Sequence, residues 1–230
     1  MPELLNYDLD GRIATLTMDD GKVNAFSIPM LEELHSAFDQ AERDEAVVLL
    51  TGRENCFSAG FDLKVFKEHP EDIVRMLTLG ATLCEKVLAF PTPVVTACTG
   101  HALAAGTFLP LCADARLGVA GQWKYTLNEV KIGLTVPLFV VELARQRLTP
   151  AEFSRAVVTA HTYSPEEAAA AGFIDQVVDG ADLRDASLAV AEEMAGLNAE
   201  AHRATKLRVR AGAISAVREA IETELESVSA

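Results

Sequence analysis

The chain has 230 residues, 50% of them hydrophobic and 23% charged, which is enough apolar material for one large domain or two small ones. It carries 20 Lys and Arg residues against 34 Asp and Glu, and the resulting charge of −14 argues against a general binder of nucleic acid or anionic membranes. No apolar run reaches the ~18 residues of a membrane span, and residues 1–8 lack the basic and apolar regions of a signal peptide. The four cysteines show no metal or disulfide spacing, so we expect a cytoplasmic protein with reduced thiols.

The first residues predict a β-hairpin followed by a helix. Residues 4–9 and 12–18 are β-prone runs, and the Asp-Gly pair between them is a two-residue hairpin signal. Ser27 is a candidate helix N-cap, and apolar residues then recur at helical spacing as far as Glu42.

The middle of the chain predicts buried strands separated by a loop and a long helix. Residues 46–51, 94–98 and 115–120 are predicted strands, the first two because they are short apolar runs rich in β-branched residues. Residues 52–62 contain two glycines and predict a loop, and residues 72–90 predict a helix that a Pro-Thr-Pro sequence ends.

The second half predicts helices. Thr149 and Ser164 each begin a capping box, with proline at the first helical position. Asp182 predicts the start of another helix, and a last helix is expected from about His202 to Leu225. We therefore expect a β/α core over residues 1–180 and a helical C-terminal extension over residues 181–230.

Several common active sites are missing from the sequence. There is no phosphate-binding loop with a Gly-Lys-Ser/Thr ending and no dinucleotide-binding Gly-x-Gly-x-x-Gly. Cys56 stands where a Gly-x-Ser-x-Gly nucleophile motif around Ser58 needs its first glycine. The five histidines lie far apart in sequence, so we expect no metal site.

Three segments stand out. Two of them contain small residues that allow special backbone conformations, and the third contains a lone charged side chain. Residues 56–64 follow a buried strand and contain small residues, which can leave backbone N–H groups facing a ligand. Residues 99–108 combine small residues with a helix start, although Pro110 must distort the first turns of that helix. Glu129 lies between apolar residues. Taken singly, the first segment is also typical of an ordinary turn, and the second is typical of close helix–sheet packing. The third is typical of an exposed glutamate.

Together the three segments resemble those of the crotonase, or enoyl-CoA hydratase/isomerase, superfamily. Residues 57–63 (Phe-Ser-Ala-Gly-Phe-Asp-Leu) resemble its first oxyanion loop, and residues 100–106 (Gly-His-Ala-Leu-Ala-Ala-Gly) its second. Residues 128–134 (Asn-Glu-Val-Lys-Ile-Gly-Leu) resemble its catalytic glutamate segment, and residues 19–25 also fit. All four occur in the family's order, and the resemblance covers residues 4–225.

The resemblance implies an α/β fold, a spiral of ββα turns with a helical C-terminal region that builds a homotrimer or a dimer of trimers. It implies an acyl-CoA thioester as substrate, in fatty acid metabolism, with coenzyme A bound as part of that substrate and no separate cofactor. The thioester carbonyl would accept hydrogen bonds from the backbone N–H groups of Phe61 and Ala105. Two fixed donors stabilise the enolate more than the ground state, and one such donor is worth on the order of 3 kcal/mol.

One departure from the family bears on the reaction. Hydratases of the family use two glutamates, and Phe108 stands at the position of the first, leaving Glu129 alone. A lone carboxylate holds a reacting water poorly but can carry a proton from C2 to C4, so we expect an enoyl-CoA isomerase that converts 3-enoyl-CoA into 2-enoyl-CoA. Phe108 would keep the site dry and raise the pKa of Glu129. The alternatives are a hydratase (a lyase), a bifunctional hydratase/isomerase, another reaction on an acyl-CoA, and a non-catalytic acyl-CoA-binding scaffold.

Other residues are expected to bind the CoA portion of the substrate. CoA is anionic, so a local basic patch is required on a chain of net negative charge. The resemblance and the position of the basic residues together suggest the following substrate- or CoA-binding residues: Lys22, Asn24, Ala59, Asp62, Leu63, Lys64, Phe108 and Lys206. Of these, Lys206 would reach the CoA of a neighbouring subunit.

Overall fold

The computed structural model describes residues 4–226 and confirms an α/β fold. Its larger sheet has six strands in the order β1-β2-β4-β7-β9-β11. The strands are β1 Leu5–Asp10, β2 Ile13–Met18, β4 Val47–Thr51, β7 Val94–Cys98, β9 Ala115–Val119 and β11 Gln176–Val178. The hairpin β1–β2 is antiparallel, as expected, and every other pairing in this sheet is parallel.

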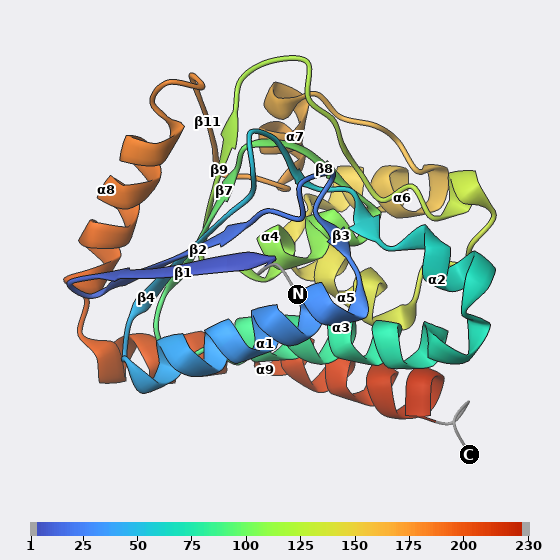
Figure 1. Ribbon diagram of the computed structural model, residues 1–230, viewed down its shortest axis with the longest axis horizontal. Helices are drawn as coiled ribbons and strands as arrows, with labels where there is room; N and C mark the ends of the chain where they lie inside the picture. The colour runs from blue at the N-terminus through green and yellow to red at the C-terminus, as the bar shows by residue number, and fades with distance from the viewer. Residues whose placement is uncertain (1–3, 227–230) are drawn as a thin grey trace.

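The two faces of this sheet are covered by different helices. Alternate residues of β4 point to opposite sides, so Val48 and Leu50 join the main core while Val47 and Leu49 join a second cluster. The second cluster is completed by Leu183 and Ala191 of α8 (Leu183–Ala195). Figure 1 shows α8 on one side of the sheet, with α1 (Ile28–Arg43) and α3 (Ile73–Ala89) side by side on the other.

Two smaller sheets lie beside the large one. A three-stranded parallel sheet has the order β10-β8-β5, and a two-stranded parallel sheet pairs β3 with β6. Their strands are β3 Ala25–Phe26, β5 Asn55–Ser58, β6 Gly60–Phe61, β8 Gly100–Leu103 and β10 Tyr125–Thr126. The prediction of a plain loop over residues 52–62 was therefore wrong, because β5 and β6 lie there and pair with distant strands.

The remaining helical elements of the described residues are short, apart from α9. They are α2 Leu63–Glu68, η1 Pro70–Asp72, η2 Ala104–Thr107, α4 Phe108–Cys112, η3 Val130–Ile132, α5 Leu138–Arg147, α6 Pro150–Thr159, α7 Pro165–Ala171, α9 Ala199–Ala220 and η4 Ile221–Glu226.

Helix caps confirm part of the prediction. Ser164 forms the expected capping box with Glu167, and Ser27 accepts a hydrogen bond from the Met30 amide. At Thr149 the expected box is wrong: the side chain makes no cap bond, and Glu152 instead accepts from the Tyr163 hydroxyl.

The C-terminal helices pack on the rest of the molecule. Helix α8 contacts the large sheet, and α9 contacts α3 and α5. The boundary at residue 180 and the assembly into trimers stay predictions. Within the described residues, no helix is both long enough and apolar enough to cross a membrane.

Candidate active site

The three-stranded parallel sheet brings the three sequence segments to one edge. Ser58 of β5 lies opposite Ala102 of β8, and Leu103 of β8 lies opposite Thr126 of β10. Because parallel strands end at the same edge, the residues that follow them emerge together. These residues include Phe61 after β5, Ala105 after β8 and Glu129 after β10, with β8 in the centre.

Glycine allows the first two segments to touch. Gly60 has φ +91°, and a Cβ atom on it would lie 2.8 Å from the Leu103 oxygen and 3.0 Å from the Ala105 nitrogen. Gly106 is equally restricted, because a Cβ there would collide with the Ser58 carbonyl. The Ala105 amide nitrogen thus lies directly beside the residue that precedes Phe61, so the two expected donor residues are close together in space.

The Ala105 amide belongs to the first turn of a helical segment. Ala105 is the second residue of η2, where backbone N–H groups have no partner inside the helix. The preceding residue, Ala104, has φ +47°, a strained conformation for a residue with a Cβ. The distortion expected from Pro110 is present, since the 3-10 turn η2 precedes a five-residue α4.

The first segment is fixed by buried side chains. Asn24 is fully buried, and its amide donates to the Met18 oxygen at 2.9 Å and the Phe57 oxygen at 3.2 Å. Ser58 Oγ donates to the Asn24 carbonyl at 2.7 Å and accepts from the Gly60 amide at 3.1 Å. Asn24, expected to bind substrate, instead has its side chain bonded within the protein, and with Ser58 it positions β5 and β6.

Ser58 was not singled out from the sequence as a positioning residue. Its role depends on the β3–β6 pairing, which residues far apart in the sequence create. The Ser-Ala-Gly triplet alone is compatible with any turn, so no local signal could have identified the hydroxyl as a bridge.

Glu129 is a buried glutamate whose carboxylate is only partly satisfied by hydrogen bonds. The residue is 6% exposed, and its Oε2 atom has no hydrogen-bond partner among residues 4–226. Burial raises the pKa of Glu129 above the ordinary glutamate value, as expected. A carboxylate in this state can accept a proton readily and hold it, which suits a proton shuttle.

Phe108 is the residue that the family resemblance aligns with the second glutamate of hydratases. Its ring is 2% exposed and lies edge-to-face between Phe61 and Phe139, with centroid distances of 6.0 Å and 5.6 Å. This position therefore supplies an apolar ring that belongs to an aromatic cluster, in place of a second acid.

The predicted CoA-binding residues of the first segment lie at the start of α2. Asp62 caps this helix by accepting from the Lys64 amide at 2.9 Å, and the Ala59 amide donates to the Val23 oxygen. Leu63 is 50% exposed, and Lys64 is also exposed. Lys22 is exposed in the turn before β3. Lys22 and Lys64 are thus available to an anionic ligand, while the Asp62 carboxylate is engaged by its own helix.

Lys206 lies in a different environment from the one expected. Its ammonium group is buried and lies 2.7 Å from the Asp114 carboxylate, which also pairs with Arg210 at 2.9 Å. Burial lowers the pKa of Lys206 to about 8. A side chain 3% exposed does not extend into solvent, so Lys206 is a structural ion-pair residue of this chain and is left out of the proposed site.

A surface pocket of about 470 Å³ lies beside this ion pair, along α9. Its lining includes Lys206, Arg210, Arg147 and Asp114, and it includes none of the three segments at the sheet edge. Arg147 and Arg210 already donate to backbone carbonyls at the end of α4, those of Leu111 and Cys112. Their positions are explained by these hydrogen bonds, which satisfy carbonyl groups at the C-terminal end of α4.

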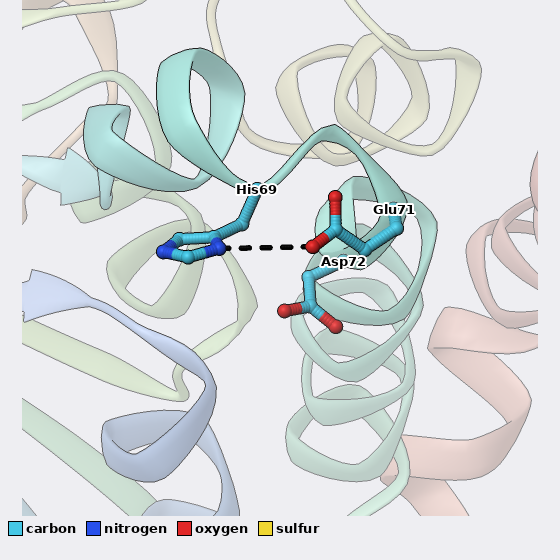
Figure 2. A group of neighbouring side chains, drawn as sticks. All are labelled: His69, Glu71 and Asp72. Carbon is cyan, nitrogen blue, oxygen red and sulfur yellow. Dashed lines mark ion pairs between the residues drawn. The ribbon is translucent and has the colours of Figure 1, made fainter.

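One group of side chains has the composition of a metal site. His69, Glu71 and Asp72, around η1, place their ligand atoms within 4.8 Å of one another (Figure 2). His69 and Glu71 are 57% and 70% exposed and already form a 3.7 Å ion pair. Such surface groupings commonly form without a metal, so the cluster does not by itself indicate a metal centre.

His101 and Trp123 have local partners. The His101 ring accepts from the Lys124 amide at 3.1 Å, and the Trp123 ring nitrogen donates to the Ala120 oxygen at 3.2 Å. The two rings also pack edge-to-face. Both side chains therefore hold the connection before β10 in place.

Comparison with known proteins identifies one family. The sequence description of the enoyl-CoA hydratase/isomerase family matches residues 8–230. An enoyl-CoA hydratase/isomerase family protein from Pseudomonas syringae is 44% identical, with a TM-score of 0.95 over 97% of both chains. This likeness extends over the whole fold.

The named relatives differ in the reaction attributed to them. A Mycobacterium tuberculosis protein described as an enoyl-CoA isomerase is 41% identical, with a TM-score of 0.93 over 96% of this chain and 97% of its own. A second structure of that protein, 40% identical over 99% and 97% of the two chains with a TM-score of 0.94, is described as a probable enoyl-CoA hydratase. A probable enoyl-CoA hydratase of Bacillus subtilis is 34% identical over 56% of this chain, a match that spans about half (52%) of that relative.

Proposed function

The chain belongs to the enoyl-CoA hydratase/isomerase family, and on that premise we propose that it converts 3-enoyl-CoA thioesters into 2-enoyl-CoA thioesters. The observation that carries this proposal is the combination of a buried carboxylate, one oxygen of which has no partner among the described residues, and a phenylalanine where hydratases of the family have a second acid. Glu129 supplies the carboxylate, and Phe108 supplies the ring.

The chemistry begins with the thioester carbonyl. Its oxygen would accept hydrogen bonds from the backbone amides of Phe61 and Ala105, which follow neighbouring strands. Removal of a proton from C2 places negative charge on that oxygen, and fixed donors stabilise this charge more than they stabilise the substrate. The η2 helix start contributes further partial positive charge at the Ala105 amide.

Glu129 would carry the proton. As a carboxylate it removes the C2 proton of a 3-enoyl-CoA, and as the neutral acid it returns a proton to C4 of the dienolate. The double bond moves into conjugation with the thioester, and no atom is gained or lost. Burial supports this role because it brings the proton affinity of the carboxylate closer to that of the dienolate.

Hydration is the second candidate, favoured by the names of two relatives. Addition of water requires a water molecule held close to the double bond by groups that exchange protons with it. The aromatic cluster of Phe61, Phe108 and Phe139 offers no such group. For this reason we place isomerisation first.

The two reactions separate in one assay. Purified protein is given a 3-enoyl-CoA and, separately, a 2-enoyl-CoA, and absorbance of the conjugated thioester is followed. We expect conjugation to appear with the first substrate and to persist with the second. Loss of absorbance with the second substrate alone would establish hydration and overturn the proposal, and binding without turnover of either would favour the scaffold.

Glu129→Gln is the matched variant for this assay. It keeps the size of the side chain and removes the base, so we expect turnover to fall at least about a hundredfold, the usual contribution of a general base. Binding of a saturated acyl-CoA should be retained. Full activity in this variant would remove Glu129 from the mechanism.

A further inference from the structure

We propose that the ring of Phe61, seated against Gly80, closes the acyl end of the site and makes the protein select short acyl chains. This inference rests on the proposed acyl-CoA substrate. It gives Phe61 two separate tasks, because its backbone amide would bind the carbonyl while its side chain limits the length of the acyl group.

The ring of Phe61 lies between two of the elements that surround the site. It packs edge-to-face on Phe108, with an interplanar angle of 74°, and Phe108 follows Ala105 by only three positions. Phe108 in turn packs edge-to-face on Phe139 of α5. The Phe61 ring is therefore at one end of a row of three contacting rings, and it is partly exposed whereas Phe108 and Phe139 are buried.

Helix α3 has a glycine, Gly80, where the Phe61 ring packs against it. A Cβ atom on Gly80 would lie 2.6 Å from Phe61 Cζ and 2.7 Å from Cε1, closer than real contacts allow. Its neighbours one turn away on the same buried face, Met76 and Cys84, carry full side chains. Glycine inside a helix is less stable than alanine, so its presence at this one position is explained by the space that it leaves for the Phe61 ring.

The seated ring occupies space that a longer acyl chain would need. If the carbonyl is held by the amides of Phe61 and Ala105, the acyl group starts beside the Phe61 side chain. The Phe61 ring packs against both Phe108 and Gly80 of α3, and closely packed side chains do not compress. Additional methylene groups would have to displace the Phe61 ring.

The test measures binding, so that it does not depend on the reaction. Calorimetry compares saturated four-, eight- and twelve-carbon acyl-CoAs on the full chain and on Phe61→Ala. We expect Phe61→Ala to raise the affinity for the longer chains relative to the four-carbon chain by about tenfold or more, the scale of one or two extra methylene contacts. Phe61→Leu, which keeps more of the packing, should move the ratio in the same direction by less.

Gly80→Ala provides the matched control through a double-variant cycle. Its methyl group collides with the ring of the natural protein, so it should lower the affinity for long chains further. In the Phe61→Ala background the ring is gone, and the same substitution should leave the chain-length ratio unchanged. An identical effect of Gly80→Ala in both backgrounds would assign it to α3 alone and overturn the inference.

The outcomes distinguish this inference from the proposed reaction. A chain-length ratio that shifts in Phe61→Ala supports the inference even if 3-enoyl-CoA is not isomerised. An unchanged ratio overturns it even if isomerisation is observed. Failure of every acyl-CoA to bind would overturn both.

Discussion

The Glu129 carboxylate is the proposed base, and its burial also lowers the stability of the folded chain. It is almost fully buried, one oxygen has no partner among the described residues, and its pKa is raised by burial. A group whose folded pKa exceeds its unfolded pKa binds more protons in the folded state between the two values. Stability therefore falls as pH rises through that interval and stays lower above it.

Glu129→Gln should for this reason stabilise the fold at neutral pH. The variant has no charge to bury, so we expect its free energy of unfolding to exceed that of the natural protein at pH 7 by on the order of 1 kcal/mol. Near pH 4, about the ordinary glutamate pKa, the difference should shrink, because the natural side chain is then protonated in the folded state. Denaturant titrations at both pH values measure this, and a difference that does not depend on pH would contradict it.

At the scale of elements, the site depends on how closely β6 approaches η2. Gly60 makes that approach possible, since a Cβ atom there would press on the Leu103 oxygen and the Ala105 nitrogen. The two proposed oxyanion donors would then be forced apart, although neither donor residue had been changed.

Gly60→Ala is therefore expected to damage catalysis more than stability. We expect turnover to fall by about a hundredfold, as when one oxyanion donor is lost, with a folded chain by circular dichroism. Gly11→Ala is the matched control, because Gly11 also has positive φ but meets nothing within 4 Å. It should cost about 1 kcal/mol of backbone strain and leave turnover unchanged. Equal loss of turnover in both variants would contradict the expectation.

The sequence predicts elements whose signals are local, and misses those that depend on distant partners. Helix α3 and strand β7 lie where periodicity, apolar composition and prolines place them, and Ser164 caps α7 as its motif indicates. Strands β8 and β10 have no such signal. Both strands are short and form through pairing, since β10 pairs with β8 and β8 pairs with β5.

The site shows the same limit. Family resemblance locates Phe61, Ala105 and Glu129, and the structure brings them to one sheet edge. Asn24 and Lys206 were assigned to the ligand from the family resemblance and, for Lys206, from its position in a basic stretch of the C-terminal helix. Only the fold reveals that Asn24 bonds to the Met18 and Phe57 carbonyls and that Lys206 pairs with Asp114.

At the scale of the whole molecule, the charge of −14 repels an anionic ligand. Recognition of CoA therefore requires cations close to the site that act over a short range. Lys22 and Lys64 are exposed beside the first segment, whereas Lys206 is buried in its ion pair.

Lys22→Ala and Lys64→Ala should each weaken acyl-CoA binding at low ionic strength by about twofold to fivefold, the scale of an exposed charge pair. The loss should diminish at physiological salt, because exposed charges are then screened. Arg208→Ala on α9 removes the same charge from another exposed position and is the control, with little expected effect. Equal weakening in all three variants would show that overall charge acts without a local patch.

The small parallel sheet carries the proposed reactive groups, and part of the chain between β5 and β8 lies outside it. The proposed carbonyl donors and the proposed base follow three adjoining strands, whereas α2 and η1 occupy a connection that contributes no strand to that sheet. Such a connection can be lengthened, shortened or exchanged while the reactive groups stay in register. Insertions there, after Lys64, should therefore preserve the proposed reaction, while the choice of acyl length stays with the proposed contact of Phe61 with Gly80.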